Sequence, residues 1–109
     1  MLFRSVQGVD GALVGSATFI PQLIIDLWNA VKRGDLHQAM KIQALITPLK
    51  DAVYGGGEPT GEAHARMKAG MYLAGVLTDH TVRPPTHAPN EQEMAVLRSA
   101  VSQAGLLKR

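Results

Sequence analysis

The chain has 109 residues, of which 46% are hydrophobic and 18% charged, and its formal net charge at pH 7 is +2. This length allows one domain at most. The eleven Lys and Arg residues are dispersed, so no nucleic-acid partner is predicted. The sequence contains no Cys, which excludes disulfides and thiolate metal sites and suits the cytoplasm. No apolar stretch approaches the ~20 residues of a bilayer span, and no signal peptide is recognisable. We therefore expect a soluble cytoplasmic chain with no membrane partner.

One short strand is predicted near the N-terminus. The segment GVDGALVGSATFIP, residues 8–21, contains an apolar run at 12–14 between glycines at 11 and 15. Such a run is typical of a parallel strand that is buried on both faces. We expect this strand at about 11–15, although no second strand is predicted to pair with it.

Two helices are predicted next. The first spans about 21–33, with Pro21 in its first turn and Gly34 as its stop. The second is capped by Asp35, with Gln38 in capping-box position, and ends at glycines 55–57. Because proline disrupts helices, a kink or break is expected at Pro48. The predicted apolar faces are Leu23, Ile24, Leu27 and Val31 in the first helix and Leu36, Ala39, Ile42, Ile46, Leu49 and Val53 in the second.

Two further helices complete the chain. The third, about 61–77, is rich in Ala and Gly and is expected to lie among other helices. A polar, proline-bearing connection follows. The last helix runs from Asn90 to Ala104, with Glu93 in capping-box position and Gly105 as its stop.

Local motifs carry little chemistry. The glycines at 8, 11 and 15 match no phosphate-binding loop. Asp51 and Glu58 are interpreted as helix-end charges, Lys68 as a side chain that reaches solvent from a packed helix, and Trp28 as a packing residue. No metal site is predicted, because the four histidines lack metal-ligand spacing: His37, His64, His80 and His87.

The order of the elements is more informative. A glycine-rich strand leads to a Pro, then to a helix ending in Gly-Asp, a helix with Pro-Leu, a helix with Lys-Ala and later Leu and Gly, an Arg-x-Pro segment and a final Ala-Gly-Leu. In this chain these are Gly8–Leu13 with Pro21, LIIDLWNAVKRGDLHQA at 23–39, Pro48-Leu49, Lys68-Ala69 with Leu73 and Gly75, Arg83-Pro84-Pro85, and Ala104-Gly105-Leu106. With these six features in one order, the chain resembles the C-terminal section of the dihydrodipicolinate synthase and N-acetylneuraminate lyase family.

The resemblance implies an α/β fold class. Residues 1–33 would supply the last strand and last helix of a TIM (β/α)8 barrel, and residues 34–109 an appended helical region, so that the chain itself is mostly α with one short strand. A complete barrel needs roughly 250 residues, so we expect a C-terminal fragment of a longer enzyme. Residues 1–5, MLFRS, are interpreted as a cloning or assembly scar.

The resemblance also implies the chemistry of a class I aldolase-type lyase. In such enzymes a barrel lysine forms a Schiff base with pyruvate or another 2-oxo acid, and a barrel tyrosine relays protons. No metal or other cofactor is needed, and the complete enzyme is expected to be a homo-oligomer. Both catalytic residues lie on strands upstream of the last one. We therefore assign no catalytic residue to this chain and expect it to be inactive alone.

Three residues that follow the strand are candidates for the rim of the substrate pocket. Active sites in these barrels lie at the C-terminal ends of the strands, which points to Gly15, Ser16 and Thr18. The alternative is an ordinary turn. Thr18 stands where many relatives have Asn, and Val14 where they often have Ser. Dihydrodipicolinate synthesis, sugar-acid aldol cleavage and sugar-acid dehydration therefore stay open.

A second function class also stays open, namely a free-standing, non-catalytic helical interaction module derived from such an enzyme. A fragment should expose apolar surface and therefore aggregate or bind a hydrophobic dye. A module should unfold cooperatively as a monomer.

Overall fold

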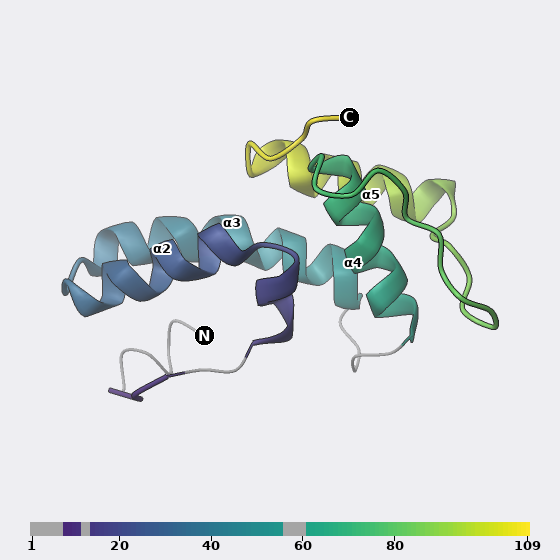
Figure 1. The fold of residues 1–109 in the computed structure, drawn as a ribbon. Helices are drawn as coiled ribbons and strands as arrows, with labels where there is room; N and C mark the ends of the chain where they lie inside the picture. Colours follow the sequence, from purple (N-terminus) through teal and green to yellow (C-terminus); the bar gives the residue numbers. More distant parts are fainter. Residues whose placement is uncertain (1–7, 12–13, 56–60) are drawn as a thin grey trace. The chain divides into compact units, whose positions relative to one another are not determined.

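The structure, a computed structural model, describes residues 8–11, 14–55 and 61–109. Its elements are one 3-10 turn and four α-helices (Figure 1): η1 (Gly15–Thr18), α2 (Pro21–Lys32), α3 (Leu36–Tyr54), α4 (Gly61–Leu73) and α5 (Glu91–Gln103). The prediction that the chain is mostly helical is confirmed. No helix in this described part of the chain is long and apolar enough to cross a membrane.

The predicted strand at about 11–15 is not seen where its residues are described. Residues 12 and 13, its centre, lie outside the described residues. Gly11 and Val14 have no regular structure, although the Val14 backbone is extended (φ −122°, ψ 118°), and Gly15 already belongs to η1. A strand requires a neighbour to share its backbone hydrogen bonds. None of the ranges 8–11, 14–55 and 61–109 provides such a neighbour.

The chain divides into two compact units, Met1–Ile46 and Thr47–Arg109. The boundary falls inside α3, which is one helix with Pro48 in its interior. A kink or break was predicted at Pro48, and the break is wrong because the helix continues through it. Proline removes one backbone hydrogen bond from a helix. The helix continues because Leu49 and Val53, 0% and 1% exposed, are packed on the far side of the proline.

The core of the first unit comes from η1, α2 and the first part of α3. Its buried side chains are Phe19, Ile20, Ile24, Leu27, Ala30, Ala39, Ile42 and Ile46. Leu36 was expected on this apolar face, but it is 48% exposed. It is the first residue of α3, directly after the turn that follows α2, and so lies at the edge of the packed stripe. As predicted, the Asp35 carboxylate caps α3 by accepting the Gln38 N–H at 3.1 Å.

The second unit packs α4 against α5. Small residues of α4 are buried, among them Ala63, Ala65 and Ala69, which lets neighbouring backbone approach closely. On α5, Leu97 and Val101 are fully buried. The predicted capping box is present, because the Asn90 side chain accepts the Glu93 N–H at 2.8 Å and the Glu93 carboxylate accepts the Asn90 N–H.

The third helix is shorter than predicted. It was expected to reach about residue 77, but α4 ends at Leu73. Gly75 has φ +78°, a left-handed conformation that only glycine adopts at little cost. Its N–H donates to Tyr72 O at 3.0 Å, and the Val76 N–H donates to Met71 O at 2.9 Å. This pair of bonds is the Schellman motif that terminates helices.

Candidate functional site

The three candidate rim residues lie together on η1, in the first unit. The Ala17 N–H donates to Val14 O at 3.1 Å, and the N–H groups of Phe19 and Ile20 both donate to Ser16 O, at 3.0 and 2.9 Å. Phe19 and Ile20 are 5% and 3% exposed. The turn is therefore fixed by its own backbone bonds and anchored in the core just before α2.

This turn leaves its polar groups accessible. Gly15 and Thr18 are exposed, and Ser16 is half-buried. Within the ranges 8–11, 14–55 and 61–109, neither the Ser16 nor the Thr18 hydroxyl has a hydrogen-bond partner. A hydroxyl can both donate and accept a hydrogen bond, so the turn offers two such groups to a small polar ligand.

None of the lysines occupies an environment suited to imine formation. A Schiff-base lysine is commonly desolvated in an apolar pocket or placed beside another cation. All five lysine side chains are exposed: Lys32, Lys41, Lys50, Lys68 and Lys108. The Lys68 Nζ donates to Thr81 O at 3.2 Å, and the Lys32 Nζ lies 5.2 Å from the ring centroid of Trp28, which is half-buried.

The histidines are scattered. His37, His64 and His87 are exposed, whereas His80 is half-buried against Tyr72, with 4.9 Å between the ring centroids. In the part of the chain that the structure describes, no three His, Asp or Glu side chains gather closely enough to hold a metal ion. Glu58, considered above together with Asp51, lies outside the described residues.

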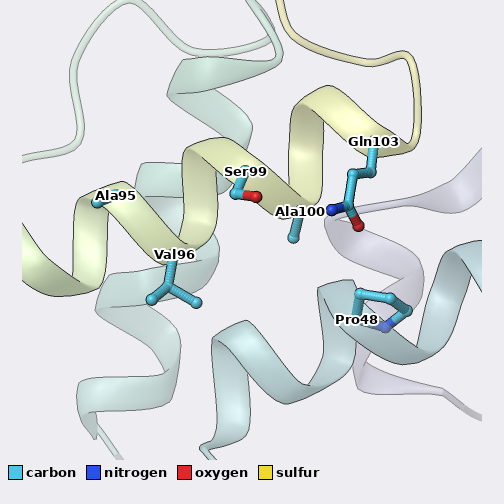
Figure 2. A pocket seen from close by; sticks show the side chains of 6 residues that line it. All are labelled: Pro48, Ala95, Val96, Ser99, Ala100 and Gln103. Atoms are coloured by element: carbon cyan, nitrogen blue, oxygen red, sulfur yellow. The ribbon is translucent and has the colours of Figure 1, made fainter.

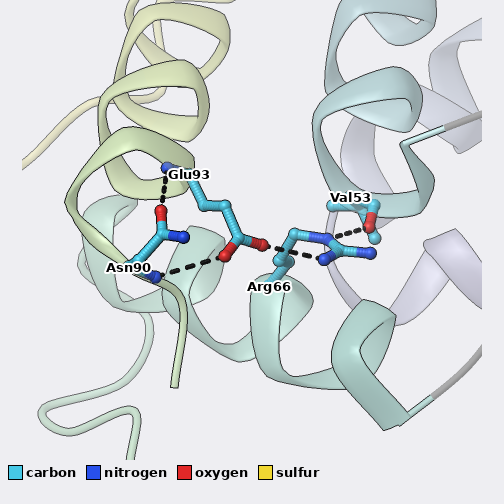
Figure 3. A network of polar contacts seen from close by, with 4 residues as sticks. All are labelled: Val53, Arg66, Asn90 and Glu93. Carbon is cyan, nitrogen blue, oxygen red and sulfur yellow. Dashed lines mark hydrogen bonds and ion pairs between the residues drawn. The ribbon is translucent and has the colours of Figure 1, made fainter. Parts of the chain in front are cut away.

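A polar network that the sequence analysis did not anticipate joins three helices of the second unit (Figure 3). The Arg66 side chain, from α4, donates through Nε to Val53 O near the end of α3 and through Nη1 to Glu93 Oε2 of α5 at 2.9 Å. Glu93 is also the capping residue of α5. The one feature of the sequence that could have indicated this network is the long cationic side chain of Arg66 among the small residues of α4. This network links α3, α4 and α5 within the second unit.

One open groove of about 380 Å³ also lies in the second unit (Figure 2). It runs between Pro48 of α3 and the outer face of α5, and is lined by Pro48, Ala95, Val96, Ser99, Ala100 and Gln103. All of these side chains are uncharged, and Ser99 is exposed with no His near it in the lining. The groove therefore offers apolar surface but no catalytic group.

Comparison with known sequences identifies the relatives of this chain. The sequence profile of the Dihydrodipicolinate synthetase family matches residues 1–104. The 4-hydroxy-tetrahydrodipicolinate synthase of Bartonella quintana (strain Toulouse) is 34% identical over 104 residues, covering 95% of this chain and 33% of that protein. The enzyme of the same name from Rhodopseudomonas palustris (strain BisA53) is 34% identical over 102 residues, with coverages of 92% and 32%. The chain thus spans about a third of the length of these curated relatives.

Two solved structures share the fold. A monomeric variant of dihydrodipicolinate synthase superposes with a TM-score of 0.80 at 22% identity, covering 97% of this chain and 33% of that one. The dihydrodipicolinate synthase of Bacteroides thetaiotaomicron gives 0.75 at 22% identity, with coverages of 94% and 34%. The predicted fold, a mostly helical C-terminal piece of a TIM-barrel enzyme, is confirmed by these likenesses. With its family profile matched over residues 1–104, the chain belongs to the dihydrodipicolinate synthetase family, whose members are lyases.

Proposed function

We propose that this chain is the C-terminal section of a Schiff-base-forming lyase that acts on pyruvate or a related 2-oxo acid. The observation that carries the proposal is the family match over residues 1–104, together with relatives three times as long as the region they share with this chain. The same match supports the lyase over a free-standing interaction module, because it extends continuously through η1 and all four helices.

The proposed chemistry passes through an imine. The amine of an upstream lysine adds to the keto carbon of the 2-oxo acid and water leaves. The protonated imine then accepts an electron pair, so that the neighbouring carbon loses a proton and becomes a nucleophilic enamine. The enamine attacks an aldehyde, and water releases the product and restores the lysine. Aldol cleavage is the reverse sequence.

Within that chemistry, Gly15, Ser16 and Thr18 are assigned to the rim of the substrate pocket. Their role is to bind and orient the 2-oxo acid rather than to form bonds with it. The accessible hydroxyls of Ser16 and Thr18, held on a turn that Phe19 anchors, support this assignment. A carboxylate accepts hydrogen bonds from such donors.

Imine trapping tests the proposal. The longer protein that contains the upstream strands is incubated with pyruvate, reduced with borohydride and analysed by intact-mass spectrometry, and the 109-residue chain is treated in parallel. We expect a reduced pyruvate adduct on the longer protein and none on the 109-residue chain. An adduct on the short chain would show that one of its own lysines is the nucleophile, and no adduct on either protein would remove the Schiff-base mechanism.

The rim assignment has its own test. In the longer protein, Ser16→Ala and Thr18→Val should each raise KM for the 2-oxo acid by about 10- to 150-fold, because each removes one hydrogen bond to a charged group. Ser102→Ala, which removes an exposed hydroxyl on α5, is the matched control and should leave KM unchanged. If the rim variants behave like this control, η1 is an ordinary turn.

Activity assays identify the substrate and the type of reaction. A panel of pyruvate with different aldehydes, and of sugar acids, distinguishes aldol condensation, aldol cleavage and dehydration. We expect the complete enzyme to be a cytoplasmic homo-oligomer that needs no metal. One relative in solved form is a monomeric variant of dihydrodipicolinate synthase, so light scattering on the longer protein decides the oligomeric state.

A further inference from the structure

Two segments of the second unit meet at the end of α4. We call residues 106–109 the C-terminal strap, and residues 78–81 the connecting loop. Tyr72, in the last turn of α4, contacts both: the Arg109 guanidinium lies 4.8 Å from its ring centroid, and the His80 ring lies 4.9 Å from it at an interplanar angle of 53°. One aromatic side chain is therefore shared by a cation of the strap and an imidazole of the loop.

The strap is held on the backbone at the end of α4. The N–H groups of Lys108 and Arg109 both donate to Leu73 O, at 2.8 and 3.1 Å. The Arg109 side chain donates through Nε to Tyr72 O at 3.0 Å and through Nη2 to Leu77 O at 3.2 Å. These carbonyls belong to the end of a helix and the turn after it, where intrahelical donors run out. The strap supplies donors to Leu73 O and Leu77 O, and a second donor to Tyr72 O, which also accepts the Gly75 N–H. Its bond to Leu77 O fixes the residue that precedes the loop.

Gly75 shows how closely the strap approaches. A Cβ atom built on this glycine would lie 2.9 Å from Lys108 Cβ, a separation that real Cβ atoms essentially never show. The strap therefore lies directly on the turn that leads into the connecting loop.

The connecting loop has fewer attachments. The Lys68 Nζ donates to Thr81 O at 3.2 Å, and the Asp79 carboxylate accepts the Thr81 N–H at 3.1 Å. The His80 Nδ1 is buried and, in the described residues, has no hydrogen-bond partner. Among the described residues, the contact that the structure shows for the His80 ring is the one with Tyr72.

We propose that Tyr72 couples the C-terminal strap to the connecting loop, so that release of either segment loosens the other. When the strap leaves, the Tyr72 ring loses its cation and Leu77 O loses its donor. When the loop leaves, Tyr72 loses the ring that confines it beneath Arg109. Coupling between two sites is reciprocal, so a molecule that binds the strap is sensed at the loop, and one that binds the loop is sensed at the strap.

Hydrogen exchange on the longer protein that contains this chain tests this coupling, because each segment has a reporter amide. The Lys108 N–H reports the strap, and the Thr81 N–H reports the loop. We expect His80→Ala to speed exchange at Lys108 by about two- to fivefold, and Arg109→Ala to speed exchange at Thr81 by a similar factor, the value of a cation–π contact at an exposed site. His87→Ala, an exposed histidine in the same connection, is the control and should change neither amide.

Substitutions of Tyr72 test whether its ring carries the effect. Tyr72→Phe keeps the ring and should preserve both responses, whereas Tyr72→Leu should remove the response of Lys108 to His80→Ala. The response of Thr81 to Arg109→Ala does not test the ring, because Arg109 also donates to Leu77 O. The proposal is overturned if each variant affects only its own segment while Tyr72 is intact, or if the response of Lys108 to His80→Ala survives in Tyr72→Leu. The exchange pattern with Tyr72 intact decides the matter even if Tyr72→Leu fails to fold.

Discussion

Replacing Arg66 by methionine removes the guanidinium that joins α3, α4 and α5 while keeping a long apolar side chain of similar reach. The variant leaves Val53 O without its side-chain donor and Glu93 without its ion-pair partner. Glu93 still caps α5 through Asn90, so the capping box is preserved. The change therefore isolates the tie between helices.

The expected loss of stability follows from the exposure of the partners. The Arg66 and Glu93 side chains are 17% and 36% exposed, so solvent screening reduces the ion pair to about 0.5–1 kcal/mol. The bond to Val53 O has a charged donor and serves a carbonyl in the last turn of α3, which contributes about 1.5 kcal/mol. We expect Arg66→Met to lower the free energy of unfolding by about 2 kcal/mol.

Equilibrium urea unfolding followed by circular dichroism measures this loss. The matched variant is Glu93→Gln, which removes the charge but keeps an acceptor for the capping box, and it should cost about 0.5–1 kcal/mol. The double variant should cost less than the sum of the two, by about 0.5–1 kcal/mol. The reasoning is refuted if Arg66→Met costs less than about 0.5 kcal/mol, or if the two effects add fully.

Gly75→Ala should lower the free energy of unfolding more than Gly34→Ala does. Both glycines have positive φ, but of the two only the Gly75 Cβ would meet another segment within 4 Å. Gly34→Ala should cost about 1 kcal/mol in thermal unfolding, and equal losses would contradict the close approach at Gly75. Asn90→Ala removes the cap of α5 and should cost about 1 kcal/mol in the same assay, whereas a neutral result would mean that the capping box contributes nothing. The side-chain hydroxyl and the backbone N–H of Thr81 lower the pKa of Asp79 below its ordinary 3.8, so Thr81→Val should raise that pKa in a carbon-13 NMR titration; an unchanged pKa would exclude the hydroxyl as its cause. Because the folded pKa is depressed, the associated stabilisation is present above pH 3.8 and is lost as the pH falls through the folded value.

Features determined by neighbours in sequence were predictable. Pro21, Asp35 and Asn90 act within one turn of their own positions, so the starts of α2, α3 and α5 follow from residue type. Gly34 and Gly105 end their helices as predicted, each with positive φ. Local chemistry was sufficient in these places because the hydrogen bonds involved span only a few residues.

Features determined by distant partners were not predictable. Gly75 ends α4 through a local Schellman motif, but nothing in the sequence around it indicates that residues 108–109 approach this turn. Arg66 finds Glu93 across 27 positions, which no periodicity indicates. At the candidate site, sequence order indicated which residues follow the expected strand, and the structure added that Ser16 and Thr18 lie on one anchored turn.

The proline within α3 has a consequence for how the chain loses structure. Pro48 has no N–H, so the hydrogen-bond ladder of α3 lacks one bond beside the boundary between the two compact units. Helical structure melts cooperatively along such a ladder, one bond at a time from the end that frays. Fraying that begins in one unit thus meets a missing bond before it enters the other, and the two halves of a continuous helix can open as separate events.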